Sequence, residues 1–208
     1  MFPLSDSAIL VKLGEQIEPA INRQVHQLAA CLSQDLPPGI LEIAPGYASL
    51  AVHYDPLLLS QREVMDWVSE RRETAKAALL RSPRRVEIPV TYNGPDLAFV
   101  AEHCRIKVGE VIKLHSGAEY TVYTMGFMPG FPYLGKLPEA LAAPRLATPR
   151  SYVPAGSVAI AGAQTGIYPV DSPGGWRLIG QTTVKLYDAQ RSPPFLLAPG
   201  DTVRFIPL

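Results

Sequence analysis

From Gly126 to Thr182 the chain reads GFMPGFPYLGKLPEALAAPRLATPRSYVPAGSVAIAGAQTGIYPVDSPGGWRLIGQT. Glycine and proline recur every few residues, between aromatic residues, arginine, glutamine and serine. Proline fixes φ and glycine tolerates positive φ, so this stretch predicts turns and short strands rather than helix. A disordered linker would be more highly charged and poorer in apolar residues. We therefore expect a folded shell of rigid loops, which is where binding and catalytic groups tend to lie.

The bulk composition excludes several classes of protein. The 208 residues are 47% hydrophobic, which is enough for a buried core, and their formal net charge is zero. A nucleic-acid-binding or membrane-surface protein would usually carry a basic excess, so neither partner is expected. Cys31 and Cys104 fit neither a disulfide framework nor a metal site, which favours a reducing compartment. With no basic leader and no apolar run of membrane-spanning length, the sequence predicts a cytoplasmic protein.

The first part of the chain predicts a small α/β sandwich. Strand-like apolar runs at residues 8–13, 40–44 and 48–54 are interspersed with two amphipathic helices. Pro19 opens the first helix, and a capping box of Ser60 and Glu63 opens the second. The residues expected to face inward from the second helix are Val64, Trp67, Val68 and Leu79. The order β-α-β-β-α suggests a ferredoxin-like sandwich, with both helices on one face of an antiparallel sheet.

The second part predicts a closed, irregular β-barrel, so the expected class is α+β. The boundary is expected at Ser82-Pro83, giving domains 1–82 and 83–208; the net charge of −3 over residues 1–81 and +3 over 82–208 fits two units. A strand at residues 86–92 contains Pro89 and should lie at a sheet edge. Two short helices follow, the second near residues 108–115. Further strands are expected near residues 120–122, 157–161, 166–168, 177–179, 184–187, 195–197 and 202–206.

No standard catalytic signature occurs in the sequence. It has no Walker A loop, nucleophile elbow, zinc-protease motif or dinucleotide fingerprint. Its four histidines are scattered, and no metal-binding set can be drawn from them. We therefore predict no metal site and no directly bound cofactor.

Arg145 and Arg150 are the charged candidates for a binding site. Each follows a proline within the turn-rich stretch. A guanidinium presents a planar fork of donors that suits a carboxylate or a phosphate, and the preceding proline limits the freedom of the backbone. The alternative is that both arginines tie loops together through backbone carbonyl groups.

A polar cluster follows in Gln164, Thr165 and Tyr168. Glutamine supplies both a donor and an acceptor, and tyrosine adds a flat face and a hydroxyl. Ser157 is a further candidate hydrogen-bond donor. It has no neighbouring histidine in the sequence, so its use as a nucleophile is not favoured.

Two further candidates each have a structural alternative. Trp176 stands beyond the rigid turn at residues 172–175, where a tryptophan is more often part of a core than a ligand platform. His115 precedes the turn-rich stretch and could join the site, although a histidine at a helix C-terminus is commonly explained by the helix dipole. Together the residues indicate a polar and aromatic cleft with arginine but no evident nucleophile. That combination fits a binding module, or an enzyme subunit that is incomplete alone.

Long motifs in the second part resemble those of the KipI family, also called allophanate hydrolase subunit 1 or the B subunit (PxpB) of the ATP-dependent 5-oxoprolinase. The loop-forming motif consists of Gly126, Phe127, Pro129, Gly130, Phe131, Pro132, Tyr133, Gly174 and Gly175. Matching segments also occur at residues 144–145, 149–150, 153–157, 164–169 and 172–176. The resemblance spans essentially the whole chain. Gln181 differs from the family pattern, in which a basic residue often occupies this position. The resemblance therefore implies no role for Gln181.

The resemblance implies a ferredoxin-like N-terminal domain and a cyclophilin-like C-terminal barrel. It also implies two partners, a homologous barrel subunit (KipA, or the C subunit) and an A subunit. With them the complex would open 5-oxo-L-proline to L-glutamate, using ATP and Mg²⁺, while this chain alone would be inactive. A second possibility stays open, since members named for KipI bind and inhibit a sensor histidine kinase. A cyclophilin-like fold does not by itself imply prolyl isomerase activity.

Overall fold

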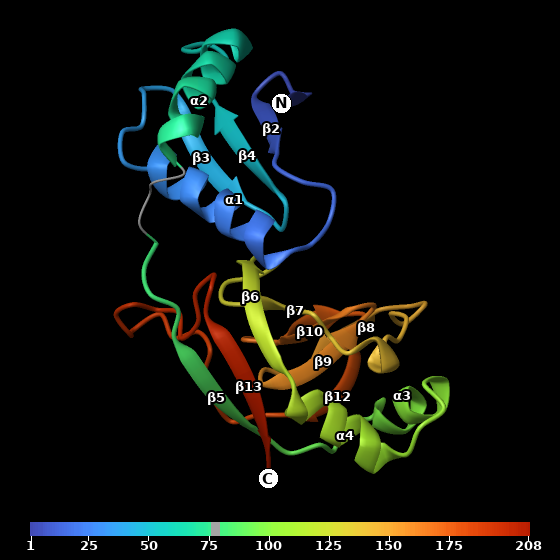
Figure 1. Cartoon of the computed structure of the whole chain (residues 1–208). Coiled ribbons are helices and arrows are strands. Elements are labelled where there is room, and N and C mark those ends of the chain that lie inside the picture. Colours follow the sequence, from blue (N-terminus) through green and yellow to red (C-terminus); the bar gives the residue numbers. More distant parts are fainter. Residues whose placement is uncertain (76–79) are drawn as a thin grey trace. The chain divides into compact units, whose positions relative to one another are not determined.

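The computed structural model describes residues 1–75 and 80–208. It is a mixed α/β structure, shown in Figure 1. Its contacts divide it into two compact units, Met1–Ser82 and Pro83–Leu208, each with its own hydrophobic core. Within the described residues, no helix combines the length and the apolar character needed to cross a membrane.

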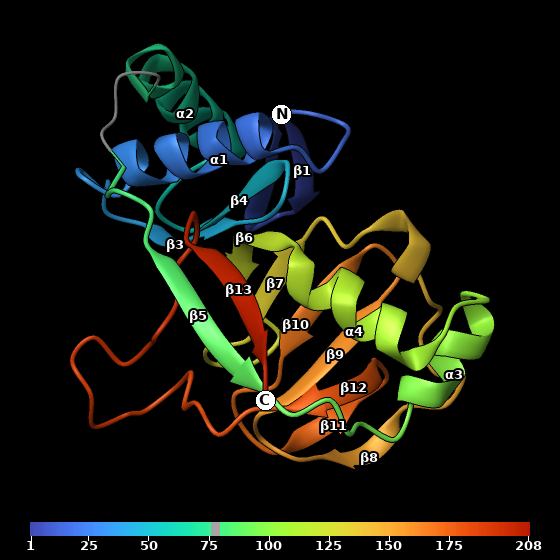
Figure 2. The ribbon, with the colours of Figure 1, turned by 60° about the horizontal axis from the view of Figure 1, so that its bottom comes forward.

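The first unit is a four-stranded antiparallel sheet with two helices on one face (Figure 2). Its strands lie in the order β1-β2-β4-β3. The elements are β1 (Phe2–Ser5), β2 (Ala8–Lys12), α1 (Pro19–Leu32), β3 (Ile40–Pro45), β4 (Ser49–Tyr54) and α2 (Gln61–Ala75). Alternate residues of β4, namely Leu50, Val52 and Tyr54, are buried because one face of the strand packs under the helices.

The helix starts of the first unit follow the sequence prediction. Pro19 is the first residue of α1. The capping box is formed: the Ser60 N–H donates to the Glu63 carboxylate at 2.8 Å, and the Glu63 N–H donates to the Ser60 hydroxyl at 3.3 Å. The edge strand β1 was missed, because all four of its residues are exposed and no buried face imposes an alternating pattern. The ferredoxin-like assignment stays a prediction, and the expected inward position of Leu79 lies outside the described residues.

The second unit is a seven-stranded sheet that curls into a nearly closed barrel (Figure 1). Its strands lie in the order β12-β9-β10-β7-β6-β13-β5. They are β5 (Arg85–Val90), β6 (Glu119–Met125), β7 (Pro132–Gly135), β9 (Ser157–Ala161), β10 (Gln164–Ile167), β12 (Arg177–Gln181) and β13 (Thr202–Pro207). A separate pair is formed by β8 (Arg150–Val153) and β11 (Ser172–Gly174). The strand with Pro89 lies at the end of this order, as predicted.

Three short helices complete the second unit: α3 (Leu97–His103), α4 (Val108–Gly117) and the 3₁₀ turn η1 (Glu139–Leu141). Helix α3 packs against β12, and α4 packs against β13. The cyclophilin-like assignment of this unit stays a prediction.

A single bridge joins the two ends of the barrel sheet. Thr91, just after β5, exchanges two backbone hydrogen bonds of 2.9 Å with Gln181 at the end of β12. The two chains approach so closely that a Cβ on Gly180 would lie 2.7 Å from the Thr91 carbonyl oxygen. Only glycine permits that approach. Gln181 thus contributes to the closure through its backbone.

The strands expected near residues 184–187 and 195–197 do not form. Tyr187 and Phe195 make only an isolated bridge, with their rings stacked at a centroid distance of 5.5 Å. The Arg191 guanidinium takes four of the loop's carbonyl oxygens, those of Lys185, Leu186, Pro193 and Pro194. Among the described residues, backbone hydrogen bonds join the two segments only at this bridge, from Leu196 N–H to the Leu186 carbonyl oxygen at 2.8 Å and from Asp188 N–H to that of Pro194 at 2.9 Å. Pro193 and Pro194 lack an N–H, so they cannot extend the pairing into a ladder.

Arg84 ties the start of the second unit to its last strand. Its backbone N–H and its guanidinium each donate to the buried carboxylate of Asp201 at 2.9 Å. The guanidinium also donates to the Leu196 carbonyl oxygen at 2.7 Å. The chain is therefore held in the barrel from Arg84 onward.

This anchoring leads to a prediction for limited proteolysis. We expect trypsin to cut within residues 80–85, at Arg81, and to leave a stable fragment that continues to Leu208, because exposed connections between units are the preferred cleavage sites. Gel electrophoresis and mass spectrometry of the digest identify the fragment. A digest that degrades the whole chain uniformly, with trypsin and with a second protease of different specificity, would show that the barrel does not fold as an independent unit.

Candidate functional site

The candidate site is a cavity of about 340 Å³ in the second unit. Two loops of the turn-rich stretch and the ends of β7 and β11 surround it. The lining consists of Phe127, Phe131, Tyr133, Arg145, Leu146, Pro149, Tyr168, Pro173, Gly174, Gly175 and Trp176. A volume of this size is near the lower end of the range for small-molecule sites, which run from about 300 to 1,000 Å³.

Four aromatic rings build the cavity wall. Phe131 is the hub: its centroid lies 5.0 Å from that of Tyr133, 5.2 Å from Tyr168 and 5.4 Å from Trp176, with all three rings near edge to face. This is the preferred geometry for aromatic pairs. Phe131, Tyr168 and Trp176 are buried in a smaller hydrophobic cluster of this unit, separate from the barrel core, so the wall is a packed structure rather than a loose surface loop.

The loop before β7 is shaped by backbone contacts. Gly126 N–H donates to the Phe131 carbonyl oxygen, and Phe131 N–H donates to that of Met128, both at 3.2 Å. Gly130 has a φ of 84° inside this turn, and Phe127 has a φ of 68°. The Phe127 ring is 66% exposed and lies edge to face with Phe131 at 5.8 Å. The loop thus holds one aromatic ring in the core and presents another at the cavity.

The opposite wall depends on Gly174. A Cβ on Gly174 would lie 2.3 Å from the Tyr168 hydroxyl oxygen, so no larger residue fits without moving that ring. Gly175 accepts a hydrogen bond of 2.8 Å from Leu146 N–H, which fixes the segment that carries Arg145. Burial raises the pKa of the Tyr168 hydroxyl, so this group stays protonated at neutral pH.

Arg145 is the charged residue of the lining. Its guanidinium carbon lies 5.8 Å from the centre of the Trp176 ring, within the range of a cation–π contact. Across the described parts of the chain, no carboxylate forms an ion pair with Arg145. The structure therefore brings Arg145, Tyr168 and Trp176 together with the glycine- and proline-rich motif, as the sequence predicted that turns could do.

Arg150 does not line the cavity. Its guanidinium donates at 2.9 Å to the carboxylate of Asp96, whose side chain is only 8% exposed. Asp96 also accepts a hydrogen bond of 2.7 Å from Leu178 N–H on β12, and Arg177 lies 3.7 Å from the same carboxylate. Arg150 therefore connects β8 to the turn before α3. The alternative in which Arg150 ties loops together therefore describes it better than a role in ligand binding. Its partner is a buried carboxylate and not the backbone carbonyl groups that were expected.

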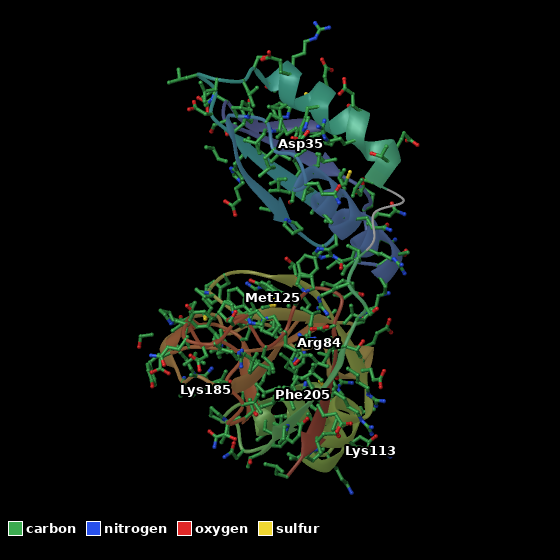
Figure 3. The ribbon with its side chains drawn as sticks, turned by 90° about the vertical axis from the view of Figure 1, so that its left-hand side faces the viewer. Asp35, Arg84, Lys113, Met125, Lys185 and Phe205 are labelled. Carbon is green, nitrogen blue, oxygen red and sulfur yellow. The ribbon has the colours of Figure 1, made fainter. Side chains whose placement is uncertain are left out.

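His115 and Thr165 lie in the barrel core, away from the cavity. His115 is fully buried, its ring stacks on Phe205 at 4.5 Å, and Phe205 lies among the side chains of this core in Figure 3. Its Nε2 lies 2.9 Å from the Thr165 hydroxyl, and its Nδ1 lies 2.7 Å from the Tyr92 hydroxyl. Thr165 donates its own proton to the Ala159 carbonyl oxygen at 3.0 Å, so it accepts from His115 Nε2–H and Tyr92 donates to Nδ1.

This hydrogen-bond chain keeps His115 neutral. Burial lowers the pKa of its imidazole to about 3, far below the ordinary value of 6.5. His115 lies in the last turn of α4, as the sequence indicated, but its ring is buried and it does not line the cavity. Its role is to pair the buried hydroxyls of Tyr92 and Thr165 inside the barrel.

Ser157 and Gln164 also lie outside the cavity lining. Ser157 is buried at the start of β9, and its carbonyl oxygen accepts a hydrogen bond of 2.9 Å from Tyr168 N–H. Gln164 begins β10 and pairs with Ala161. Both residues shape the strands behind the cavity rather than its surface.

Sequence reasoning missed the residues that hold the cavity in place. Asp96 was not singled out, although Asn93-Gly94-Pro95 before it marks a turn from which a carboxylate could reach the barrel. Pro149 and Pro173 line the cavity next to residues that were singled out. A proline is easily attributed to its turn alone, although its ring is also a flat apolar surface.

The lining carries groups that suit the binding of a ligand. It offers one guanidinium, aromatic and proline faces and a protonated tyrosine, and it contains no carboxylate, histidine, cysteine or serine among the described residues. Such a surface has no general base and no activated nucleophile. Nor do any three His, Cys, Asp or Glu side chains within residues 1–75 and 80–208 group into a metal site.

The sequence matches the family described as "Carboxyltransferase domain, subdomain C and D" over residues 1–197. It is 42% identical over 220 residues to the B subunit of the 5-oxoprolinase of Bacillus subtilis (strain 168), covering 98% of this chain and 90% of that protein. The 5-oxoprolinase B subunit of Escherichia coli O157:H7 is 44% identical, with coverage of 98% and 94%. The urea amidolyase of Lachancea kluyveri is 26% identical, and the chain spans 13% of that protein.

Solved structures resemble this one over nearly its whole length. The crystal structure of TTHA0988 aligns with a TM-score of 0.85 at 42% identity, covering 97% of this chain, which in turn spans 39% of that chain. The Kluyveromyces lactis urea amidolyase aligns with a TM-score of 0.80 at 20% identity, which shows a shared fold alone. The resemblance noted in the sequence is confirmed: the chain is similar to 5-oxoprolinase B subunits, and it belongs to the family of carboxyltransferase-domain subdomains C and D.

Proposed function

We propose that this chain is the B subunit of an ATP-dependent 5-oxoprolinase complex. The complex would open the lactam of 5-oxo-L-proline to give L-glutamate, with hydrolysis of ATP. The B subunits of two bacterial 5-oxoprolinases, at 42% and 44% identity and with 90% and 94% of their length covered, support this role. In this proposal the N-terminal unit is ferredoxin-like, the barrel is cyclophilin-like, and the protein acts in the cytoplasm.

The observation that carries the proposal is the composition of the cavity. A cation surrounded by rings suits a small anionic substrate or its phosphorylated intermediate, but the lining holds no acid, base or nucleophile. A lactam is a stable amide, and its carbonyl must be activated, for example by phosphorylation, before the ring can open. This chain would therefore contribute binding, while other subunits supply ATP, Mg²⁺ and the reacting groups.

The proposed partners are a homologous barrel subunit (KipA, or the C subunit) and the A subunit. The sequence has no ATP-binding signature, which fits a nucleotide held elsewhere in the complex. The relatives described above carry no name that points to kinase inhibition. The histidine-kinase alternative has no support from them and is not carried further.

Enzyme assays with purified subunits test this proposal. We expect the isolated chain to release neither glutamate nor ADP from 5-oxoproline and ATP, because its cavity lacks catalytic groups. Addition of the candidate A and C subunits should give ATP-dependent glutamate formation, and omission of this chain should abolish it. Turnover by the single chain would contradict the idea of an incomplete enzyme. A complete set of subunits with no turnover would contradict the assigned reaction.

A further inference from the structure

The cavity has the form of a site for a flat ring. Phe131 stands perpendicular to Trp176, with an interplanar angle of 89°, and Tyr133 is steeply tilted to it at 63°, so faces and edges of rings alternate around the space. Pro149 and Pro173 add flat apolar surfaces to the lining. A planar ligand can make offset or edge contacts with such walls, which rigid aromatic side chains provide at little cost in entropy.

The charge of the cavity is not neutralised by the protein. Several other arginines of the barrel unit have carboxylate partners: Arg84 pairs with Asp201, Arg85 with Glu119, and Arg150 with Asp96. Arg145 contacts the Trp176 ring instead, and no ion pair with it occurs in the described residues. A free guanidinium next to ring faces fits a ligand that carries both a ring and an anion.

We propose that the cavity binds a small planar ring bearing a carboxylate, with the carboxylate on Arg145 and the ring against Trp176. This inference rests on the proposed function and identifies the ligand as 5-oxo-L-proline, a five-membered lactam with one carboxylate. Among the described residues, the lining holds no carboxylate, histidine, cysteine or serine that could serve as a base or nucleophile toward the lactam carbonyl. The reacting amide would therefore face groups that another protein of the complex supplies.

Phe127 supports a ligand at this position. Its φ of 68° is a conformation that glycine adopts freely and a bulky residue rarely does. The ring is 66% exposed, so it gains little from burial in return. A strained aromatic residue at the edge of a cavity is explained if the ring covers a bound ligand.

Titration calorimetry with two probes tests the pairing between Arg145 and the carboxylate. The probes are 5-oxo-L-proline and 2-pyrrolidinone, the same lactam ring without the carboxylate, each titrated into the full-length wild-type chain and into Arg145→Gln. We expect Arg145→Gln to weaken binding of 5-oxoproline at least about tenfold, the lower range for a charged hydrogen bond, and to leave 2-pyrrolidinone binding unchanged. Arg145→Lys should restore part of the loss as a point charge.

Two further variants complete the design. Arg85→Gln makes the same change at an exposed arginine that does not line the cavity, and it should leave both titrations as in the wild type. Phe127→Gly should weaken 5-oxoproline binding while the melting temperature stays level or rises, because glycine relieves the backbone strain. Phe127→Ala removes the ring but keeps the strain, and it should weaken binding without the gain in stability.

The same variants are then assayed in the complete complex, where Arg145→Gln should raise KM for 5-oxoproline at least about tenfold. Equal loss of both probes in Arg145→Gln, or no change in either binding or KM, would overturn the inference. The inference would also be overturned if neither small molecule bound to the wild type and Arg145→Gln assembled less tightly with the homologous barrel subunit. The cavity would then be a contact surface for that subunit. If the complex is active and its KM for 5-oxoproline is the same with Arg145→Gln, this inference is wrong but the proposed function stands. If 5-oxoproline binding depends on Arg145 but the complex shows no ATP-driven turnover, this inference stands and the proposed function is wrong.

Discussion

Replacing Asp96 by alanine is expected to lower the free energy of unfolding of the barrel unit by about 3–5 kcal/mol, the range for breaking a buried ion pair on one side. The Asp96 carboxylate accepts from Arg150 at 2.9 Å and from Leu178 N–H at 2.7 Å, and its side chain is only 8% exposed. The substitution leaves a buried N–H and two guanidinium groups without their carboxylate. Urea denaturation followed by circular dichroism measures the change.

The matched control is Asp35→Ala. Asp35 also bonds to an arginine, Arg71, at 3.0 Å, but its side chain is 83% exposed. Surface pairs of this kind contribute about 0–1 kcal/mol, so this variant should unfold almost as the wild type does. If Asp35→Ala and Asp96→Ala proved equally mild, Asp96 would not be a structural centre of the barrel.

The same reasoning revises what Arg150→Ala should do. A ligand-binding Arg150 would have left the melting temperature nearly unchanged while activity fell. Because Arg150 instead pairs with Asp96, its removal should lower the melting temperature, and activity should fall in proportion to the folded fraction. The Arg145 and Arg150 variants should therefore differ in kind, the first acting on ligand binding and the second on folding.

The free energy of unfolding should fall steeply as the pH drops below about 6.5, because His115 is held neutral in the folded protein. In the folded barrel its imidazole has a pKa of about 3, whereas an unfolded chain gives the ordinary value of 6.5. Between these two values the unfolded state binds one proton more, so stability is complete above the unfolded pKa and decreases as the pH falls. The slope approaches about 1.4 kcal/mol per pH unit, or about 2 kcal/mol lost between pH 6.5 and 5.

Comparison with His115→Gln isolates this contribution. The variant has no titrating group at this position, so its free energy of unfolding should depend less on pH between 6.5 and 5. It should nevertheless be less stable than the wild type at pH 7, because Gln cannot reproduce both hydrogen bonds of the ring. NMR of the folded wild type should show a neutral His115 ring at pH 5. A ring that titrates near its ordinary value, or equal pH slopes for both proteins, would mean that His115 is not held neutral in the core.

The sequence predicted the barrel class and most of its strands because alternating apolar residues and turn residues are local signals. It did not predict β7, β8 and β11, which are short and contain or adjoin Gly and Pro. Their own residues give no strand pattern, and they form because a partner strand holds their backbone in place, β7 within the barrel sheet and β8 and β11 by pairing with each other. The strands expected near residues 184–187 and 195–197 are reduced to the bridge between Tyr187 and Phe195, because the neighbouring prolines offer no N–H with which to extend the pairing.

The candidate site was predicted in part. Arg145, Trp176 and Tyr168 lie in one cavity as expected, because the turns of the Gly/Pro motif bring them together. Arg150 could not be separated from Arg145 by sequence, since both follow proline in similar surroundings. The difference is made by Asp96, which is 54 positions away in the sequence. Likewise, only the fold shows that His115 is enclosed by Tyr92 and Thr165.

The pairing of the first and last strands of the barrel has a mechanical consequence. Strands β5 and β13 run parallel, in register from Arg85 with Thr202 to Val90 with Pro207. The chain therefore enters this pair at one end and leaves it at the other. A tension applied between Arg84 and Leu208 would load the hydrogen bonds of the pair in shear, all at once rather than one after another. A force applied through the two ends of this unit would thus act along the direction in which the unit resists mechanical unfolding most strongly.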